Sequence, residues 1–326
     1  MLQSCGNPWL LLAEHNLFDS NFSGAAFEVD AHTVLHWLIE AAEQLRAFSA
    51  SFLCDLHLEQ LQLDEVYAVL RDIKAGEISD DEALRRLERS PSWVWTAMDP
   101  TSKLLVVVDV GNRTLAMAQS VVHQVVQGLA PGCVPLFLTD GFTESATALL
   151  THCGQWVQPS RRQDKGPHPK PRWTPLPQLL YAQVVKTMRC RRLVRVRHRV
   201  MFGTLEAVEQ VLSACGWQIQ TALVERLNLD IRQRVAAIGR RVNTLCQGED
   251  SLLDQLGLFE VYHNLVLPHT SLRQPLLIPE VTNGRGSTRV WRPCTPAMAA
   301  GVTDHVWTLK EVLLYRVPPW PQPQAR

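Results

Sequence analysis

Three acidic residues stand at positions that suit metal-dependent chemistry: Asp64, Asp140 and Glu225. Asp64 lies inside one expected strand, Asp140 ends another, and Glu225 belongs to an expected helix. Carboxylates at strand ends of an α/β sheet can converge in the crevice where ligands usually bind. Converging carboxylates would bind Mg²⁺, a hard cation that prefers oxygen ligands. A pair of such ions, roughly 3.5–4 Å apart, activates a water or hydroxyl in phosphodiester chemistry.

The same acids have a plainer interpretation. The chain has 32 acidic residues, which offer many triplets, so solvated carboxylates at strand ends remain an alternative. On the later helix, Glu225, Asn228 and Arg232 fall at positions i, i+3 and i+7 and form a polar stripe. Such a stripe is common on exposed helices, so spacing alone leaves both interpretations open.

The elements that must position these acids alternate between strands and helices. Strands are predicted over 56–70, 93–98, 104–109, 134–141 and 193–202, and helices over 25–45, 78–89, 115–129, 224–238 and 252–259. The turn Asp99-Pro100-Thr101-Ser102 predicts a hairpin between the second and third strands. Three strands, a helix and a fourth strand predict a mixed α/β sheet.

The charge is distributed unevenly, although the net charge is +0. Residues 1–100 hold 17 acidic and 6 basic residues, whereas residues 161–200 hold 12 basic residues and one acid, Asp164. The Pro-rich stretch 158–177 predicts an extended loop, and the run 193–202 predicts a strand with arginines on one face. So dense a basic block indicates a polyanionic partner, and a solvated strand face is the alternative.

Cysteine spacing and hydropathy exclude other classes. The eight cysteines are scattered and never form a C-x-x-C pair, so no zinc site is predicted. No apolar run reaches the roughly 18–20 residues of a membrane span. We therefore expect a soluble protein without a membrane partner, in a reducing, cytoplasmic compartment.

Five short motifs occur in a particular order along the chain. They are LDEVY at 63–67, WVWTAMD at 93–99, GNRT at 111–114, LTDGF at 138–142 and VERLNLDIR at 224–232. In this order they resemble the DDE transposases of the insertion sequence one family, over about residues 25–273. The resemblance implies a ribonuclease H-like mixed sheet flanked by helices, in an enzyme that cuts and joins DNA strands with Mg²⁺, for which Mn²⁺ can substitute.

Carried over by position, the resemblance makes Asp64, Asp140 and Glu225 the catalytic metal ligands. It implies as partners the terminal repeats of a mobile element, target DNA and a second copy of the chain on that DNA, in association with the nucleoid. Between Asp140 and Glu225 lie 84 residues, more than in compact members, and the excess coincides with the basic stretch. We therefore interpret residues 158–203 as a basic insertion that contacts DNA.

The expected organisation has five parts. Residues 1–24 form an irregular N-terminus, 25–48 a partial helix-turn-helix, 56–157 and 204–265 the ribonuclease H-like core, 158–203 the insertion, and 266–326 an irregular tail. The partial helix-turn-helix would have its turn at Asp30 to His32 and a recognition helix from Thr33. An ordinary core helix is the alternative there. DNA contacts are expected from Thr33, His36, Arg189, Arg191, Arg192, Arg195, Arg197, Arg199, Asn228 and Arg232.

A second function competes with transposition. A decayed or truncated transposase would bind DNA without catalysis. The presence of all three acids favours catalysis, whereas the irregular first 24 residues favour a loss of targeting.

Overall fold

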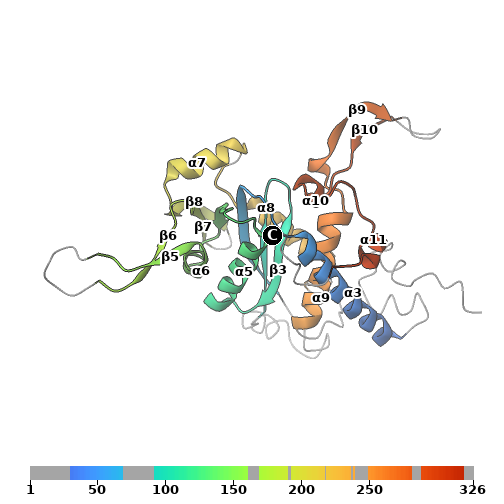
Figure 1. Ribbon diagram of the computed structural model, residues 1–326, viewed down its shortest axis with the longest axis horizontal. Coiled ribbons are helices and arrows are strands. Elements are labelled where there is room, and N and C mark those ends of the chain that lie inside the picture. Colours follow the sequence, from blue (N-terminus) through green and yellow to red (C-terminus); the bar gives the residue numbers. More distant parts are fainter. Residues whose placement is uncertain are drawn as a thin grey trace, which may run out of the picture.

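A mixed sheet of six strands forms the centre of the molecule, and helices flank it (Figure 1). The computed structural model describes residues 30–68, 92–160, 169–189, 192–216, 218–235, 238, 249–280 and 288–318. In spatial order the strands are β3 (Leu105–Gly111), β2 (Trp93–Met98), β1 (Gln60–Tyr67), β4 (Leu136–Thr139), β7 (Tyr181–Arg189) and β8 (Arg192–Phe202). The predicted mixed α/β sheet is confirmed.

Strand directions place the carboxyl ends of four strands, β1, β3, β4 and β7, at one edge. β1 runs parallel to β4 and β4 parallel to β7, whereas the pairs β1/β2, β2/β3 and β7/β8 are antiparallel. The predicted hairpin joins β2 to β3, and the Asp99 carboxylate accepts hydrogen bonds from the Thr101 and Ser102 amides at 3.1 and 2.9 Å. Asp99 thus forms an Asx-turn, in which the carboxylate accepts from backbone amides two and three residues later. The hairpin predicted from this turn sequence is confirmed.

Helices cover both faces of the sheet. Leu61 and Leu63 of β1 belong to one core cluster with Val121 of α5 (Leu115–Gly128), and α6 (Glu144–His152) packs beside α5. Val66 belongs to a second cluster with residues of α8 (Ala222–Arg234) and α9 (Glu249–Val261). Side chains alternate along a strand, so Asp64 shares the α8 face with Val66, and Glu65 shares the α5 face with Leu63.

Periodicity predicted these helices well. α5 begins where the Thr114 side chain accepts a hydrogen bond from the Met117 amide, and it ends one residue before the predicted end. The apolar stripes predicted for the last two helices are buried in α8 and α9, at Val224, Leu227, Ile231, Leu252, Leu256 and Phe259. α7 (Leu205–Ala214) covers the end of the sheet formed by β4 and β7 through Val208 and Leu212. The helix predicted over 78–89 lies outside the described residues.

The predicted N-terminal helix is present, but its helix-turn-helix interpretation is wrong in one respect. α3 (Ala31–Phe52) already includes the expected turn residues Ala31 and His32. Its later half is buried at Leu45 and Phe48, and the helix packs against α9 and α11 (Leu309–Leu314). The structure therefore favours the alternative of a core helix, because the apolar stripe continues past residue 45 into the protein interior.

The expected irregular tail is largely ordered. It contains the ribbon of β9 (Gln274–Glu280) and β10 (Arg289–Arg292), the short helices α10 (Pro296–Ala299) and α11, and a turn of 3₁₀-helix over Thr270–Leu272. Trp307 and Tyr315 pack edge-on against Phe48 of α3, with ring centroids 5.4 and 5.2 Å apart. These elements are too short to produce a clear period in the sequence. α11 packs on α3, α10 packs on the π-helical turn Tyr262–Val266, and β9 and β10 pair with each other.

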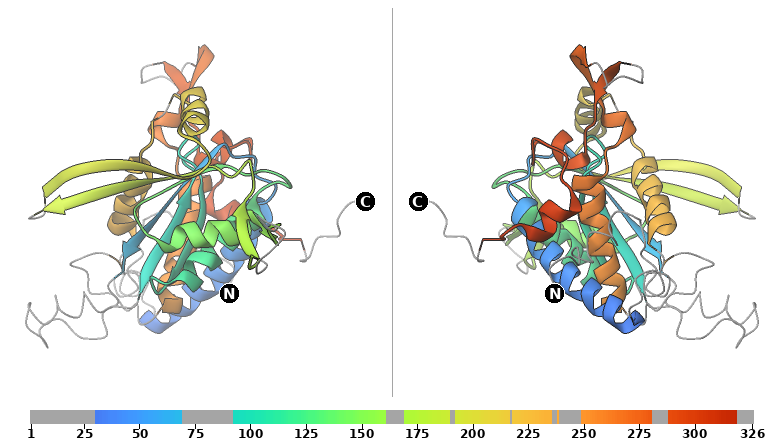
Figure 2. Two further views of the ribbon diagram at one scale, coloured as in Figure 1. Left: turned by 90° about the vertical axis from the view of Figure 1, so that its left-hand side faces the viewer. Right: turned by 90° about the vertical axis from the view of Figure 1, so that its right-hand side faces the viewer.

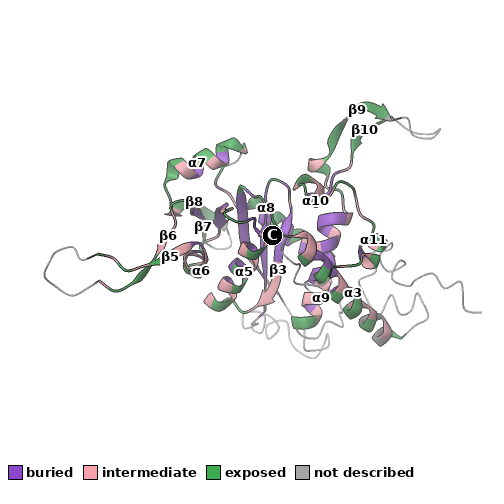
Figure 3. Ribbon diagram, viewed as in Figure 1, coloured by how far each residue is buried: buried purple, intermediate pink, exposed green. Residues whose placement is uncertain are grey.

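The expected boundary of the basic insertion does not match the sheet. β7 and β8, which fall inside 158–203, are the fifth and sixth strands of the central sheet. The stretch expected as an extended loop contains β6 (Arg172–Pro175), which pairs with β5 (Gly154–Val157) in a separate ribbon. Figure 3 shows buried strands at the centre of the sheet and exposed residues on the β5–β6 ribbon. Within the described residues, no helix has the length and apolar character needed to cross a membrane.

A buried histidine beside this sheet gives the fold a predictable pH dependence. Burial lowers the pKa of His263 to about 4, while its Nε2 lies 3.0 Å from the Lys103 carbonyl oxygen. His269 and Arg234 lower that pKa further, and Asp230 opposes them. The unfolded chain binds this proton near pH 6.5, so His263 contributes full stability above that pH and loses it as pH falls toward 4.

We expect His263→Gln to remove part of the acid sensitivity of folding. Between pH 7 and pH 5 the wild-type chain should lose about 2 kcal/mol of unfolding free energy that the variant does not lose. Urea denaturation at both pH values measures this difference. The exposed His305 is the matched control, and equal pH slopes for His263→Gln and the wild type would contradict the assignment.

Candidate functional site

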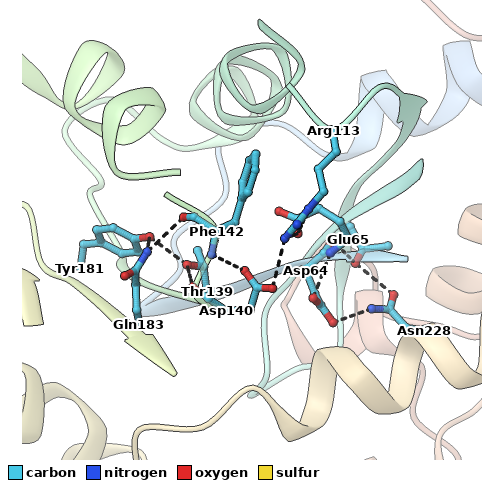
Figure 4. Close-up of polar contacts among 10 residues, drawn as sticks. Asp64, Glu65, Arg113, Thr139, Asp140, Phe142, Tyr181, Gln183 and Asn228 are labelled. Atoms are coloured by element: carbon cyan, nitrogen blue, oxygen red, sulfur yellow. Dashed lines mark hydrogen bonds and ion pairs between the residues drawn. The ribbon is translucent and has the colours of Figure 1, made fainter. Parts of the chain in front are cut away.

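Neighbouring parallel strands bring two of the predicted acids together. Leu63 of β1 pairs with Thr139 of β4, and each is followed directly by an aspartate. Asp64, Glu65 and Asp140 each offer a carboxylate oxygen, and these oxygens lie within 4.8 Å of one another (Figure 4). We call these three residues the acidic cluster. Their donor atoms are those that Mg²⁺ and Mn²⁺ prefer.

The Asp64 carboxylate is held by Asn228, a residue for which the sequence predicts a DNA contact. Asn228 Nδ2 donates to Asp64 Oδ2 at 2.9 Å, and the Thr96 hydroxyl lies 3.2 Å from both Asn228 Oδ1 and the Asp64 carbonyl oxygen. Asn228 is buried, and both ends of its side-chain amide already have partners inside the protein. Its amide instead orients the carboxylate of Asp64.

A buried glutamine fixes α8 against β1 and thereby places Asn228. Gln62 Oε1 accepts from the Val224 amide at 3.1 Å, and Gln62 Nε2 donates to the Gln220 carbonyl oxygen at 3.0 Å. Both contacts lie at the start of α8, one turn before Asn228. The position of the helix relative to Asp64 is therefore set by hydrogen bonds as well as by apolar packing.

Asp140 is held in a turn that is tied to β7. Its Oδ1 accepts from the Phe142 amide at 2.8 Å, and Gln183 Nε2 donates to the Phe142 carbonyl oxygen at 3.1 Å. The preceding Thr139 hydroxyl lies 2.8 Å from the Tyr181 hydroxyl, to which Gln183 Nε2 also donates at 2.8 Å. The LTDGF motif is thus positioned by buried polar side chains of the next strand.

Arg113 is a site residue to which the sequence assigned no role. Its Nη2 lies 3.1 Å from Glu65 Oε2 and 3.5 Å from Asp140 Oδ2. The guanidinium also lies over the Phe142 ring at 4.3 Å and near the Trp93 ring at 5.2 Å from the centroids. Glu65 was likewise missed as a ligand. The available signals were the motifs themselves, since Arg113 belongs to GNRT and Glu65 to LDEVY.

The cluster concentrates negative charge in a largely buried place. Burial raises the pKa of Asp64 to about 6, with further increases from Asp140 and Glu225. Burial also raises the pKa of Glu65 to about 8, Asp140 adds to this, and Arg113 opposes it. A cation among these oxygens relieves both the burial cost and the mutual repulsion of the carboxylates.

Glu225 lies next to the acidic cluster but outside it. Its carboxylate is exposed, forms an ion pair with Lys186 of β7, and accepts from the Thr221 hydroxyl at 2.8 Å. Glu225 stands three residues before Asn228 on α8, so the charge of its carboxylate reaches Asp64. The structure therefore brings two of the three predicted acids, Asp64 and Asp140, together, whereas the third, Glu225, forms an ion pair with Lys186.

Asp109, the other acid at a strand end, is placed elsewhere. It lies on β3, which β2 separates from β1, and Gln124 Nε2 donates to its Oδ2 at 2.6 Å. Among the described residues it belongs to no group of converging acids. The sequence argument that preferred Asp64 over Asp109 relied on strand order, and the sheet has that order.

The basic strand leaves the body of the protein as one half of a ribbon. Figure 2 shows β7 and β8 projecting together beyond the helices; we call residues 185–189 and 192–199 the arm. On β8 the arm exposes Arg195, Arg197 and Arg199, which alternate along the strand and so share a face. Arg197 pairs with Val185, and Arg199 pairs with Gln183, whose side chain reaches the Asp140 turn.

The remaining predicted DNA contacts are spread over several elements. Arg189 and Arg232 are exposed, Arg192 lies on β8, and Arg191 lies outside the described residues. Thr33 is half-buried, and His36 is exposed and 3.2 Å from Glu40, both on α3. The arm is thus the one place where several of these residues share a described surface. No family model, curated protein or solved structure matches this chain.

Proposed function

We propose that this protein is a metal-dependent DNA strand-transfer enzyme with a ribonuclease H-like core, similar to DDE transposases of the insertion sequence one family. The observation that carries the proposal is the pairing of β1 with β4, which juxtaposes Asp64 and Asp140 at one edge of the sheet. In a ribonuclease H-like sheet the first and fourth strands are neighbours. The order of motifs along the chain gives the same two aspartates independently.

The acidic cluster supplies the ligands of a divalent ion, Mg²⁺ or Mn²⁺, in this proposal. When bound, the ion activates the attacking oxygen and stabilises the leaving one. Asp64 and Asp140 would hold the ion and Glu65 would add a third oxygen, while Glu225 on α8, paired with Lys186, would be a further ligand. Asn228 keeps Asp64 in position throughout.

Arg113 has a separate role in the proposed reaction. Its guanidinium neutralises Glu65 and Asp140 before the metal ion binds, because it lies between their oxygens. It then contacts an oxygen of the reacting phosphate, for which its planar, permanently charged fork is suited. The rings of Phe142 and Trp93 keep the guanidinium at the edge of the cluster.

The arm binds the DNA backbone in this proposal. Successive arginines on one face of β8 stand about 6.6–6.8 Å apart along the strand, and all three are free to contact phosphates of one DNA molecule. The arm begins beside the Asp140 turn, so DNA held by the arm lies next to the acidic cluster.

Replacing Arg195, Arg197 and Arg199 with Ala should weaken duplex binding and reduce its salt dependence. Each neutralised phosphate contributes a slope of roughly −0.9 in log affinity against log salt, so the slope should change by about 2.7. Fluorescence anisotropy at several salt concentrations measures it. An unchanged slope would show that DNA binds elsewhere.

DNA binding without catalysis is the second candidate function. It is favoured by the ion pair that holds Glu225 outside the acidic cluster. Strand transfer from a pre-cut DNA end, with and without Mg²⁺, distinguishes the two candidates. Transfer that requires the metal ion supports the enzyme, and duplex binding without transfer supports the second candidate.

A further inference from the structure

The β5–β6 ribbon carries two exposed tryptophans that the proposed reaction does not use. Trp156 and Trp173 are directly opposite in register, and their rings meet nearly edge to face, with centroids 5.6 Å apart and planes at 64°. They are nevertheless 59% and 38% exposed. Figure 1 shows the ribbon projecting from the body beside α6. More than half of the surface of Trp156 is therefore open to a ligand.

The ribbon does not need this pair to stay attached to the protein. It packs against α6 at its base, where Gly154 lies so close to the Leu150 carbonyl oxygen that a Cβ would be 2.3 Å from it. The Leu176 amide also donates to the Cys153 carbonyl oxygen at 3.3 Å. These contacts fix the base of the ribbon, and the tryptophans stand farther out along it.

The charge of the sequence that leads into β6 indicates the chemistry of the ligand. Within residues 158–172 one acid, Asp164, stands against five cations, Arg161, Arg162, Lys165, Lys170 and Arg172. Lys170 and Arg172 are exposed next to Trp173 in sequence. Gln155 and Thr174 pair with each other one position from the tryptophans and lie on the other face of the ribbon, and both are polar. The ribbon therefore has no second apolar face of the kind that a protein-protein contact would bury. Aromatic rings among cations are instead typical of proteins that bind single-stranded nucleic acid.

We propose that Trp156 and Trp173 form a stacking site for unpaired bases of a single-stranded nucleic acid, whose phosphates contact Lys170 and Arg172. In a duplex the bases are stacked on each other and present only their edges, so their faces cannot reach the rings. The site therefore prefers single strands, unlike the arm, which binds backbone phosphates. It extends the proposed DNA function but depends on neither the acidic cluster nor the arm.

The test uses the full chain and two labelled probes, oligo(dT) of about 15 nucleotides and a blunt duplex of the same length. Trp156→Ala should weaken binding of oligo(dT) about tenfold and change duplex binding less than about twofold, because one stacked base is lost. Trp156→Phe keeps an aromatic face and should retain most of the affinity. Trp291→Ala is the matched control, since Trp291 is exposed on the separate β9–β10 ribbon but has the Arg273 guanidinium over its ring face at 4.4 Å, where a base would stack.

The proposal is overturned if Trp156→Ala leaves oligo(dT) binding unchanged or weakens both probes equally. A change in self-association by sedimentation, with oligo(dT) affinity unchanged, would also overturn it and assign the pair to a protein contact. Asp64→Asn should leave oligo(dT) binding intact. The chain could prefer single strands through its tryptophans and yet show no metal-dependent strand transfer. That result would support the stacking site and contradict the proposed enzymatic function.

Discussion

Asp64→Asn should abolish metal-dependent strand transfer while duplex binding remains within about twofold of the wild type. The substitution keeps the shape of the side chain and its partner Asn228, but it removes one charged ligand from the acidic cluster. A metal ion supplies several kcal/mol of transition-state stabilisation, so we expect a loss of about a thousandfold or more. The measurement is single-turnover transfer of a pre-cut DNA end in Mg²⁺.

Asp109→Asn is the matched control for this experiment. Asp109 also lies at the end of a strand, but its carboxylate contacts Gln124 and not the acidic cluster. We expect nearly normal transfer. If Asp109→Asn were inactive and Asp64→Asn active, the assignment of the first ligand would be wrong.

Arg113→Gln should raise the affinity for Mn²⁺ and lower the rate of transfer at the same time. The guanidinium lies where it competes with a metal ion for Glu65 and Asp140, so its removal should strengthen Mn²⁺ binding about tenfold. Loss of one charged donor to the reacting phosphate should slow transfer at least about a hundredfold. Isothermal titration with Mn²⁺ measures the affinity independently of any activity.

Arg113→Lys separates charge from geometry in the same assays. Lysine keeps the positive charge but lacks the planar fork, so Mn²⁺ affinity should stay near the wild-type value while the rate stays low. A purely structural role for Arg113 predicts weaker Mn²⁺ binding in both variants, together with a loss of folding stability. Unchanged affinity and unchanged rate in Arg113→Gln would contradict the proposed role altogether.

Much of the sheet could be predicted from the sequence because its signals are local. The apolar runs of β2, β3 and β4, the Asp99 turn and the apolar stripe of α8 each lie within a few residues. Motif order then favoured Asp64 over Asp109 as the neighbour of Asp140, and Asp64 lies with Asp140 in the acidic cluster. β7 was not predicted. Its first half is buried on both faces and its second half is exposed, so the sequence shows neither a full apolar run nor a full alternation of apolar and polar residues.

The details of the site depend on contacts between distant residues. Arg113 reaches Glu65 across 48 positions and Asn228 reaches Asp64 across 164, and no spacing rule connects such pairs. The polar stripe of α8 predicted that Glu225 and Asn228 share a face, but it could not predict that one is buried against β1 and the other paired with Lys186. Those choices depend on how α8 docks on β1, through the Gln62 hydrogen bonds together with the apolar packing of Leu227 and Ile231.

The strand β7 fixes the distance between the arginines of the arm and the acidic cluster. β7 pairs with β4 beside Asp140 and then forms half of the arm, and from Gln183↔Arg199 to Thr187↔Arg195 its pairing with β8 has no register shift. Over this stretch the backbone ladder sets how far each arginine stands from the acids. One residue added to β8 before Arg199 would turn the arginines beyond it to the opposite face, whereas two would restore the face and shift the row by about 6.6–6.8 Å. Between the two register shifts of this ladder, a change of two residues therefore preserves the face on which the arginines lie, whereas a single added residue preserves it only if it is taken up as a further bulge.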